Sequence, residues 1–211
     1  MDTNKNTLYS NMVNAGKALA LFAIIAGALV ALTFQTTKTQ ISENERMALL
    51  KTLNSLVPTK EYNNDLHADQ LSLDVESLNY RKKPITIFRA RLNNQPVAAI
   101  FSVVAPDGYS GAINLLIAIN YDKTLSGIRV VSHKETPGLG DAIDIEKSDW
   151  IKIFHLKSLT NPIEKNWRVK KDGGYFDQLT GATITPRAIV KIAKLTLQYF
   201  SENREKIFTS S

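Results

Sequence analysis

Residues 84–105 read PITIFRARLNNQPVAAIFSVVA, and this stretch decides the fold. It holds two runs rich in β-branched and other apolar side chains, Pro84–Leu92 and Gln95–Ala105. Only Asn93-Asn94 separates them, and apolar side chains partly alternate with polar ones. A connection this short joins antiparallel neighbours, since parallel strands need a long crossover. The stretch therefore predicts two adjacent antiparallel strands.

Two more runs of the same kind follow along the chain. They read AINLLIAINYD (Ala112–Asp122) and GIRVVSHKE (Gly127–Glu135), and a turn is expected at Thr124–Gly127. The connections are again short. The four runs together predict an antiparallel meander.

The C-terminal part predicts an amphipathic helix. Thr185 followed by Pro186 suggests the helix start, with Thr185 as N-cap and Pro186 at the first helical position. A further helix is expected within residues 141–157. Helices around a meander give an α+β fold. The residues that share one face of the C-terminal helix are Ile189, Ile192, Ala193, Thr196, Tyr199 and Phe200.

An apolar segment near the N-terminus predicts a membrane anchor. Ala18–Phe34 reads ALALFAIIAGALVALTF and carries no charge, so a helix of this stretch is just long enough to span a bilayer core. The alternative is a cleaved signal peptide, but the A-x-A pattern at Ala26–Ala28 lies inside the apolar run and not after it. Flanking charges give little orientation bias. The short arm before the segment and the long polar remainder favour an inside N-terminus and an outside domain.

The segments on either side of the anchor complete the expected organisation. Residues 1–17 form a short cytoplasmic arm, 18–34 the transmembrane anchor, 35–83 a stalk helix with loops, and 84–211 the main domain. A capping-box pattern at Ser42–Glu45 starts the stalk helix, and Pro58 ends it. Residues 59–83 are polar and irregular and are expected to be loops.

The composition excludes several classes of site. The chain has 211 residues, no cysteine and a net charge of +6. Without cysteine there is no disulfide, thiolate zinc site, iron–sulfur ligation or cysteine nucleophile. The three histidines lie far apart in sequence, so none forms a metal-binding pair. The basic residues are scattered, which disfavours nucleic acid as a partner and suits an anionic membrane surface better.

Three glycine-containing loops are candidates for chemistry: APDGYSGA (Ala105–Ala112), HKETPGLGD (His133–Asp141) and DQLTGAT (Asp177–Thr183). None matches a GxGxxG or Walker pattern. The third precedes a helix N-terminus, where free N–H groups and the positive dipole end favour a phosphate. A hydroxyl held there can carry a phosphate covalently, although on physical grounds alone a purely structural role at the helix start is favoured.

DQLTGAT resembles the D-x-x-[ST]-G-A-T flavinylation motif of FMN-binding domains in respiratory complexes. GYSGAI and HKETPGLGD resemble other segments of the same family, in the same order. With one N-terminal anchor and this length, the chain is similar to the family of G subunits of Rnf (Rsx) electron transport complexes. The related C subunit of the Na⁺-translocating NADH:quinone reductase shares the motif and anchor but usually has a longer N-terminal part.

The resemblance implies roles for the motif residues. A flavin transferase joins the FMN phosphate to the last threonine, which is Thr183 here. Asp177 and Thr180 belong to the signature that the transferase recognises. Gly181 and Ala182 keep the approach open, and Thr185 is expected to bond the phosphate as well as cap the helix.

The isoalloxazine ring needs a mostly apolar slot with a few polar groups. Leu139 is expected to pack on the ring. Trp150 and Trp167 are expected to belong to the core or to an interface, and not to the cofactor site. The residues expected to bond the ring edge or border its pocket are Glu135, Thr136, the backbone of Gly138, Tyr109 and Ser110.

The resemblance further implies an electron relay in which the ring carries the chemistry. The implied partners are the other membrane subunits of the complex and, during maturation, the flavin transferase. The implied location is the bacterial inner membrane, with a single pass and the main domain on the periplasmic side. Two other functions stay open: a cofactor-free docking module, and a hydrolase with a Ser or Thr nucleophile, for which no base is visible near Thr183.

Overall fold

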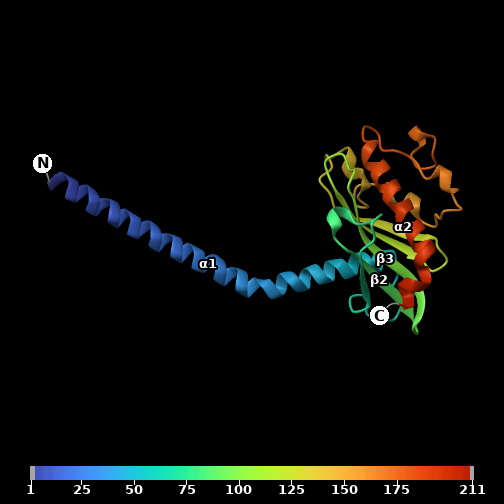
Figure 1. Ribbon diagram of the computed structural model, residues 1–211, viewed down its shortest axis with the longest axis horizontal. Coiled ribbons are helices and arrows are strands. Elements are labelled where there is room, and N and C mark those ends of the chain that lie inside the picture. The colour runs from blue at the N-terminus through green and yellow to red at the C-terminus, as the bar shows by residue number, and fades with distance from the viewer. Residues whose placement is uncertain (1–2, 210–211) are drawn as a thin grey trace. The chain divides into compact units, whose positions relative to one another are not determined.

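A computed structural model describes residues 3–209 of the chain. The chain divides into two units between Leu49 and Leu50. Helix α1 (Thr3–Leu56) forms the first unit, and its last residues belong to the second (Figure 1). The second unit holds a five-stranded sheet and helix α2 (Ile184–Thr209).

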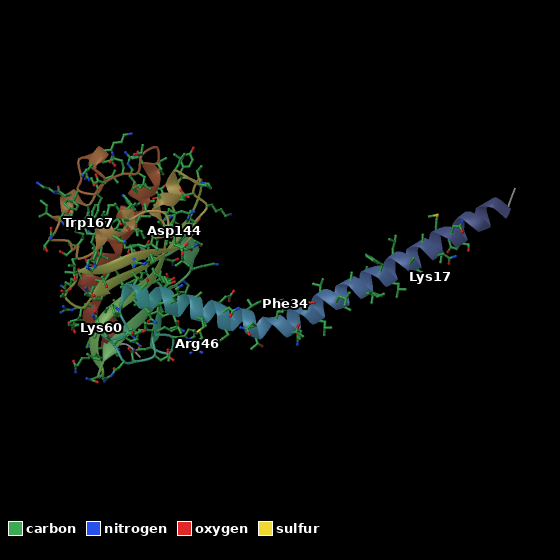
Figure 2. The ribbon with its side chains drawn as sticks, turned by 180° about the vertical axis from the view of Figure 1, so that it is seen from behind. Lys17, Phe34, Arg46, Lys60, Asp144 and Trp167 are labelled. Carbon is green, nitrogen blue, oxygen red and sulfur yellow. The ribbon has the colours of Figure 1, made fainter. Side chains whose placement is uncertain are left out.

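Helix α1 is continuous from the expected cytoplasmic arm through the anchor to the stalk. The expected start of a separate stalk helix at Ser42 is therefore wrong, because Ser42 lies inside α1. No glycine or proline interrupts it between Phe34 and Leu56. Threonines in the middle bond back to the preceding turn, as Thr37 Oγ1 does to the Thr33 carbonyl at 2.8 Å, and so remain compatible with a helix. Part of α1 is long and apolar enough to cross a membrane, and its most apolar stretch is exposed along its whole length (Figure 2).

The sheet confirms the predicted meander. The strands β1 to β5 lie in chain order, and each pairs antiparallel with the next. Asn93 and Asn94 adopt positive φ angles of 50° and 65°, the left-handed conformation that makes the β2–β3 turn tight. The strands are β1 (Gln70–Leu73), β2 (Ile85–Leu92), β3 (Gln95–Ala105), β4 (Ile113–Asn120) and β5 (Leu125–Ser132).

Three further expectations, for the segments around the sheet, are wrong. Residues 59–83 are not all loop, because Gln70–Leu73 adds the edge strand β1, which buries chiefly Leu71. The β4–β5 turn precedes the expected Thr124–Gly127: Lys123 has φ 72°, and Asp122 Oδ1 accepts hydrogen bonds from Thr124 N–H and Oγ1 at 2.9 and 2.7 Å. Residues 141–157 form no α-helix but two short 3₁₀ helices, η2 (Gly140–Ile143) and η3 (Trp150–Phe154).

One face of the sheet packs against α2. The apolar residues of β2, β3 and β4 alternate, and the register aligns Ile87, Phe101 and Ile117 on this face. Phe101 meets Phe200 of α2 edge-on, with ring centroids 6.1 Å apart. This layer of sheet and helix forms the main core of the domain.

The opposite face receives the end of α1. There the register aligns Ile100, Ala118 and Gly127, and the small residues allow a close approach. A Cβ at Gly127 would lie 3.1 Å from Leu56 Cδ2. Ser126 Oγ donates to the Leu56 carbonyl, and Arg129 Nη2 donates to the Ser55 carbonyl at 3.2 Å. These donors satisfy carbonyls that a helix C-terminus leaves without partners.

A charged cluster fixes the far end of α2 to the sheet. Asp69 accepts Nε–H of Arg89 at 2.5 Å and of Arg91 at 2.8 Å. The two guanidinium groups also donate to the carbonyls of Ile207 and Phe208, the last buried residues of α2. Both arginine side chains and Asp69 are largely removed from water, so the cluster depends on having every partner present.

We expect Asp69→Asn to lower the free energy of unfolding by about 2 kcal/mol, because it leaves two partly buried guanidinium groups facing a neutral amide. Urea titration of the detergent-solubilised chain, followed by tryptophan fluorescence, measures this loss. The matched control is Asp149→Asn, which removes an exposed ion pair to Lys152 and should change stability by less than about 0.5 kcal/mol. Equal losses in the two variants would contradict the assignment.

Candidate functional site

Glu135 is the point at which the first two candidate loops meet the start of α2. Its side chain is buried, with only 4% of the residue exposed. Oε1 accepts the Ser110 N–H at 3.0 Å, and Oε2 accepts the Thr185 hydroxyl at 2.5 Å. One carboxylate therefore joins the loop after β3, the loop after β5 and the first turn of α2.

Two glycines make room for this carboxylate. A Cβ at Gly108 would lie 2.9 Å from Glu135 Oε1, and a Cβ at Gly140 would lie 2.8 Å from Oε2 and 3.2 Å from Thr185 Oγ1. Contacts under 3 Å are closer than van der Waals packing allows. The Glu135 side chain therefore accounts for the glycine at position 140 and contributes at position 108, where a Cβ would also lie 2.2 Å from the Gly111 carbonyl oxygen.

The helix start differs from the sequence expectation. Helix α2 begins at Ile184, and the Thr183 carbonyl accepts the Arg187 N–H at 3.3 Å. Thr183 thus occupies the N-cap position, and Thr185 lies inside the first turn with its hydroxyl on Glu135. Pro186 is tolerated here because the first turn of a helix has no intrahelical acceptor for its N–H groups.

The Thr183 side chain is half-buried. Within residues 3–209, its hydroxyl has no hydrogen-bond partner. The adjacent first turn supplies amide N–H groups that the helix itself leaves free, and its dipole is positive at this end. This end of α2 thus combines an unengaged hydroxyl with donors for an anion.

The residues before Thr183 form a tight turn. Ala182 N–H donates to the Leu179 carbonyl at 3.1 Å, and Gly181 has φ 77°, which favours glycine. Thr180 is exposed at the tip. A Cβ at Gly181 would lie 3.1 Å from Leu139 Cδ2, so the Leu139 side chain rests against this turn.

The loop after β5 is held in a tight turn by hydrogen bonds within its own backbone. The Thr136 carbonyl accepts N–H groups of Leu139 and Gly140 at 3.2 and 3.1 Å, and Gly138 has φ 77°. Thr136 and Gly138 are exposed, and Leu139 is 46% exposed although apolar. The loop therefore presents an apolar side chain and polar backbone at the surface beside the Thr183 turn.

The backbone of Asp177 is held by a hydrogen bond, and its side chain is exposed to solvent. Its carbonyl accepts Trp150 Nε1–H at 2.7 Å, and its exposed carboxylate pairs with Lys170 at 2.6 Å. Trp150 packs edge-on against Phe154, within an aromatic cluster that includes Trp167. Both tryptophans are buried, as expected for core residues.

A second ion pair lies beside the start of α2. Arg187 Nε and Nη2 donate to the two carboxylate oxygens of Asp172 at 2.6 and 2.5 Å. This hydrogen-bonded guanidinium lowers the pKa of Asp172. The contact ties the segment before the motif to the first turn of the helix.

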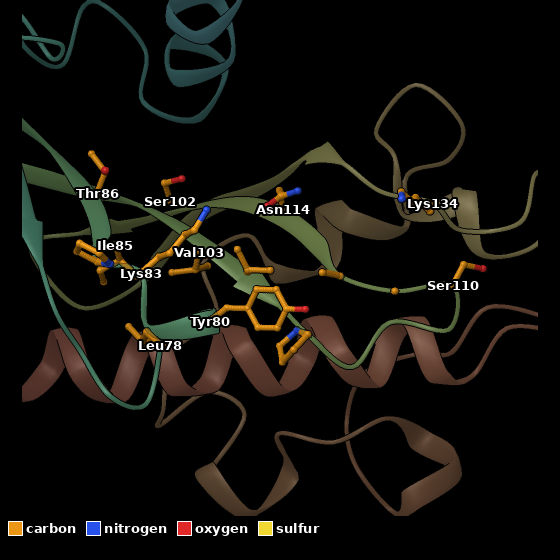
Figure 3. A pocket seen from close by; sticks show the side chains of 15 residues that line it. Leu78, Tyr80, Lys83, Ile85, Thr86, Ser102, Val103, Ser110, Asn114 and Lys134 are labelled. Carbon is orange, nitrogen blue, oxygen red and sulfur yellow. The ribbon is translucent and has the colours of Figure 1, made fainter.

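A pocket of about 610 Å³ borders the site (Figure 3). Ser110 and Lys134 lie at one end, and Tyr80 and Lys83 lie toward the other. Of the candidate site residues, Ser110 lines it, whereas Leu139 and Thr183 do not. Tyr109, 69% exposed, also lies outside the lining. Residues 3–209 contain no group of His, Asp and Glu side chains arranged to hold a metal ion.

Comparison with known proteins adds the family. An RnfG N-terminal region model matches residues 1–56, and an FMN-binding domain model matches residues 108–198. The G subunit of the ion-translocating oxidoreductase complex of Pseudoalteromonas atlantica is 46% identical over 93% of this chain and 91% of its own length. The G subunits of Aliivibrio fischeri and Pseudomonas aeruginosa are 42% and 44% identical, over 96% and 93% of this chain and 96% and 92% of theirs.

The chain belongs to the family of G subunits of ion-translocating oxidoreductase complexes. This confirms the resemblance to that family and decides against the C subunit of the NADH:quinone reductase. All three candidate loops meet within or beside the FMN-binding match, which begins at Gly108. In this member of the family, the apolar helix α1 also indicates a single-pass membrane protein.

Sequence reasoning missed three features of this site. Gly108 and Gly140 were visible as glycines, but nothing local showed that they flank a carboxylate. The Trp150 bond to the Asp177 carbonyl joins positions 27 residues apart and leaves no pattern in the sequence. The fixed positions of Glu135 and Thr185, 50 residues apart, are likewise visible only in the fold.

We expect Gly140→Ala to destabilise the domain by about 2 kcal/mol, because the new Cβ meets both Glu135 Oε2 and Thr185 Oγ1. Thermal unfolding by circular dichroism measures the change. Gly138→Asn is the matched control: no atom lies within 4 Å of a Cβ there, and asparagine tolerates positive φ. The control should cost less than Gly140→Ala, and the reverse order would contradict the packing described.

Proposed function

We propose that the chain is the subunit of an ion-translocating oxidoreductase complex that carries FMN covalently on Thr183 and relays electrons to and from neighbouring subunits. The observation that carries this proposal is the unengaged Thr183 hydroxyl at the N-terminus of α2, inside the DQLTGAT motif. The family match to an FMN-binding domain supports the cofactor.

The residues at the start of α2 fit a phosphate. The phosphoester forms between Thr183 Oγ and the FMN phosphorus, and the hydroxyl proton leaves to the transferase. The donor of the FMN group in this reaction is FAD. Its pyrophosphate bond breaks as the ester forms, and AMP is released. The phosphodiester bears a negative charge, which the N–H groups and dipole of the first turn stabilise. The small Gly181 and Ala182 leave the approach open, and Asp177 and Thr180 face solvent where a transferase can contact them.

The surface around Thr183 suits a partly exposed ring. Leu139 rests against the Gly181 turn with nearly half its area exposed and offers an apolar surface for the ring. Thr136 and the backbone of Gly138 offer polar groups to its edge. The loop that carries Tyr109 and Ser110 is joined to this region through the Ser110 N–H bond to Glu135. Bound FMN accepts and donates electrons, while the protein sets its position and surroundings.

Attachment through Thr183 has a physical advantage for an electron relay. A ring held only by contacts must be deeply buried to stay bound, whereas a ring held by a covalent bond remains in place when partly exposed. Partial exposure allows close approach of redox centres in other subunits. The other membrane subunits of the complex and, during maturation, a flavin transferase are therefore the expected partners.

Two other functions are less well supported. A cofactor-free docking module does not require an unengaged hydroxyl at a helix start. A hydrolase needs a base on its nucleophile, and the Thr183 hydroxyl contacts none within residues 3–209.

We expect the chain produced together with a flavin transferase to gain the mass of FMN less one water and to fluoresce under ultraviolet light after denaturing electrophoresis. Thr183→Ala should abolish both signals, because it removes the only oxygen that forms the ester. Thr59→Ala, at an exposed threonine outside the motif, should retain them. A native chain without the adduct, or an adduct in Thr183→Ala, would refute the proposal.

The periplasmic orientation can be tested because the native chain has no cysteine. We expect a membrane-impermeant maleimide added to intact spheroplasts to label Lys165→Cys, at an exposed position of the domain, but not Ser10→Cys before the anchor. Both should react after detergent lysis. Labelling of Ser10→Cys alone in intact cells would show the opposite orientation.

A further inference from the structure

We propose that Glu135 is a positioning residue that orients the start of α2 for flavin attachment and does not itself contact the flavin. This inference rests on the proposed attachment to Thr183. It assigns Glu135 a different role from the ring-edge contact that the sequence suggested.

The side chain is buried and already engaged by the protein. Only 4% of the residue is exposed, and each carboxylate oxygen already accepts a hydrogen bond from the protein, one from Ser110 and one from Thr185. Gly108 and Gly140 lie against the two oxygens from either side. A ring edge could reach this carboxylate only if the residues that cover it moved aside, because so little of the side chain is exposed.

The backbone of Glu135 is held as well. Its N–H donates to Nδ1 of His133 at 3.0 Å, and the following residue, Thr136, closes the loop onto Leu139 and Gly140. The carboxylate thus projects from a fixed base. Its two contacts lie 25 and 50 residues away in sequence, so local structure alone does not hold them there.

The contact with Thr185 reaches the reactive hydroxyl through one helical turn. Thr185 is fully buried and lies two residues after Thr183, within the same first turn. Because that turn is rigid, fixing Thr185 Oγ1 also fixes the direction of the free N–H groups and of the Thr183 N-cap. Loss of the contact frees the helix start to shift, and attack on a phosphorus atom depends strongly on such alignment.

The carboxylate acts through hydrogen bonds, so its charge is not required. A glutamine at position 135 can accept the Ser110 N–H with its oxygen and donate its amide N–H to Thr185, whose hydroxyl both donates and accepts. Alanine can do neither. Glu135→Gln therefore separates positioning from any role that needs the negative charge.

The experiment uses the full-length apo chain, made in a host without the transferase and purified in detergent. Flavin transferase, FAD and Mg²⁺ are added, and intact mass follows the fraction of chain that gains FMN with time. We expect Glu135→Ala and Thr185→Val to slow attachment roughly tenfold or more. Glu135→Gln and Thr185→Ser should stay within about threefold of the native rate, because both keep the hydrogen bonds.

A buried threonine elsewhere in α2 supplies the control. Thr196 is as buried as Thr185, and its hydroxyl donates to the Ile192 carbonyl at 2.7 Å. Thr196→Val should leave the attachment rate unchanged although it removes a hydrogen bond from the same helix. If Glu135→Ala does not fold, the comparison of Thr185→Val with Thr185→Ser and Thr196→Val still decides the question.

The conservative variants decide the outcome. A Gln variant as slow as the Ala variant, or native rates in both Glu135→Ala and Thr185→Val, would overturn the proposal. Failure of the native chain to be loaded would instead refute attachment at Thr183.

Discussion

A buried carboxylate must have its hydrogen bonds satisfied within the protein, because an unpaired one costs more free energy than the domain has to spare. Glu135 meets this requirement with one donor from the loop after β3 and one from α2. The residues that surround the carboxylate are constrained by this requirement. Both loops need glycine where they pass the carboxylate, and α2 needs a hydroxyl in its first turn. The hydrogen bonds of Glu135 thereby join three segments that belong to different secondary-structure elements.

The sheet explains why those segments can meet at all. Its meander brings the loops after β3 and β5 to the same end of the sheet, because every second connection of an antiparallel meander lies at the same end of the strands. Helix α2 crosses one face through Phe101 and Phe200, and its far end is held by Arg89 and Arg91. With its C-terminal end and its middle fixed, the start of α2 is directed to the loop end of the sheet (Figure 1).

The sequence was informative where a residue's role depends on near neighbours. The alternation and short connections around Asn93-Asn94 led to the meander, and a compact motif led to the family. It was uninformative where the role depends on distant partners. Thr185 looks like an N-cap because Pro186 follows it, but Glu135, 50 residues earlier, takes its hydroxyl. Strand β1 was missed because its alternation of polar and apolar residues, QLSL, spans only four positions within a polar segment.

The last turn of α1 is part of the folded domain that follows the membrane helix. Leu53 and Leu56 are buried, as is Val57 directly after the helix, and the carbonyls of Leu56 and Ser55 accept hydrogen bonds from Ser126 and Arg129. These residues continue the helix that carries the anchor, yet they cover one face of the sheet. A fragment cut where the helix ends would expose that face, with the apolar side chains around Ile100. A soluble version suited to crystallisation should therefore begin at or before Leu50 and retain the end of the membrane helix.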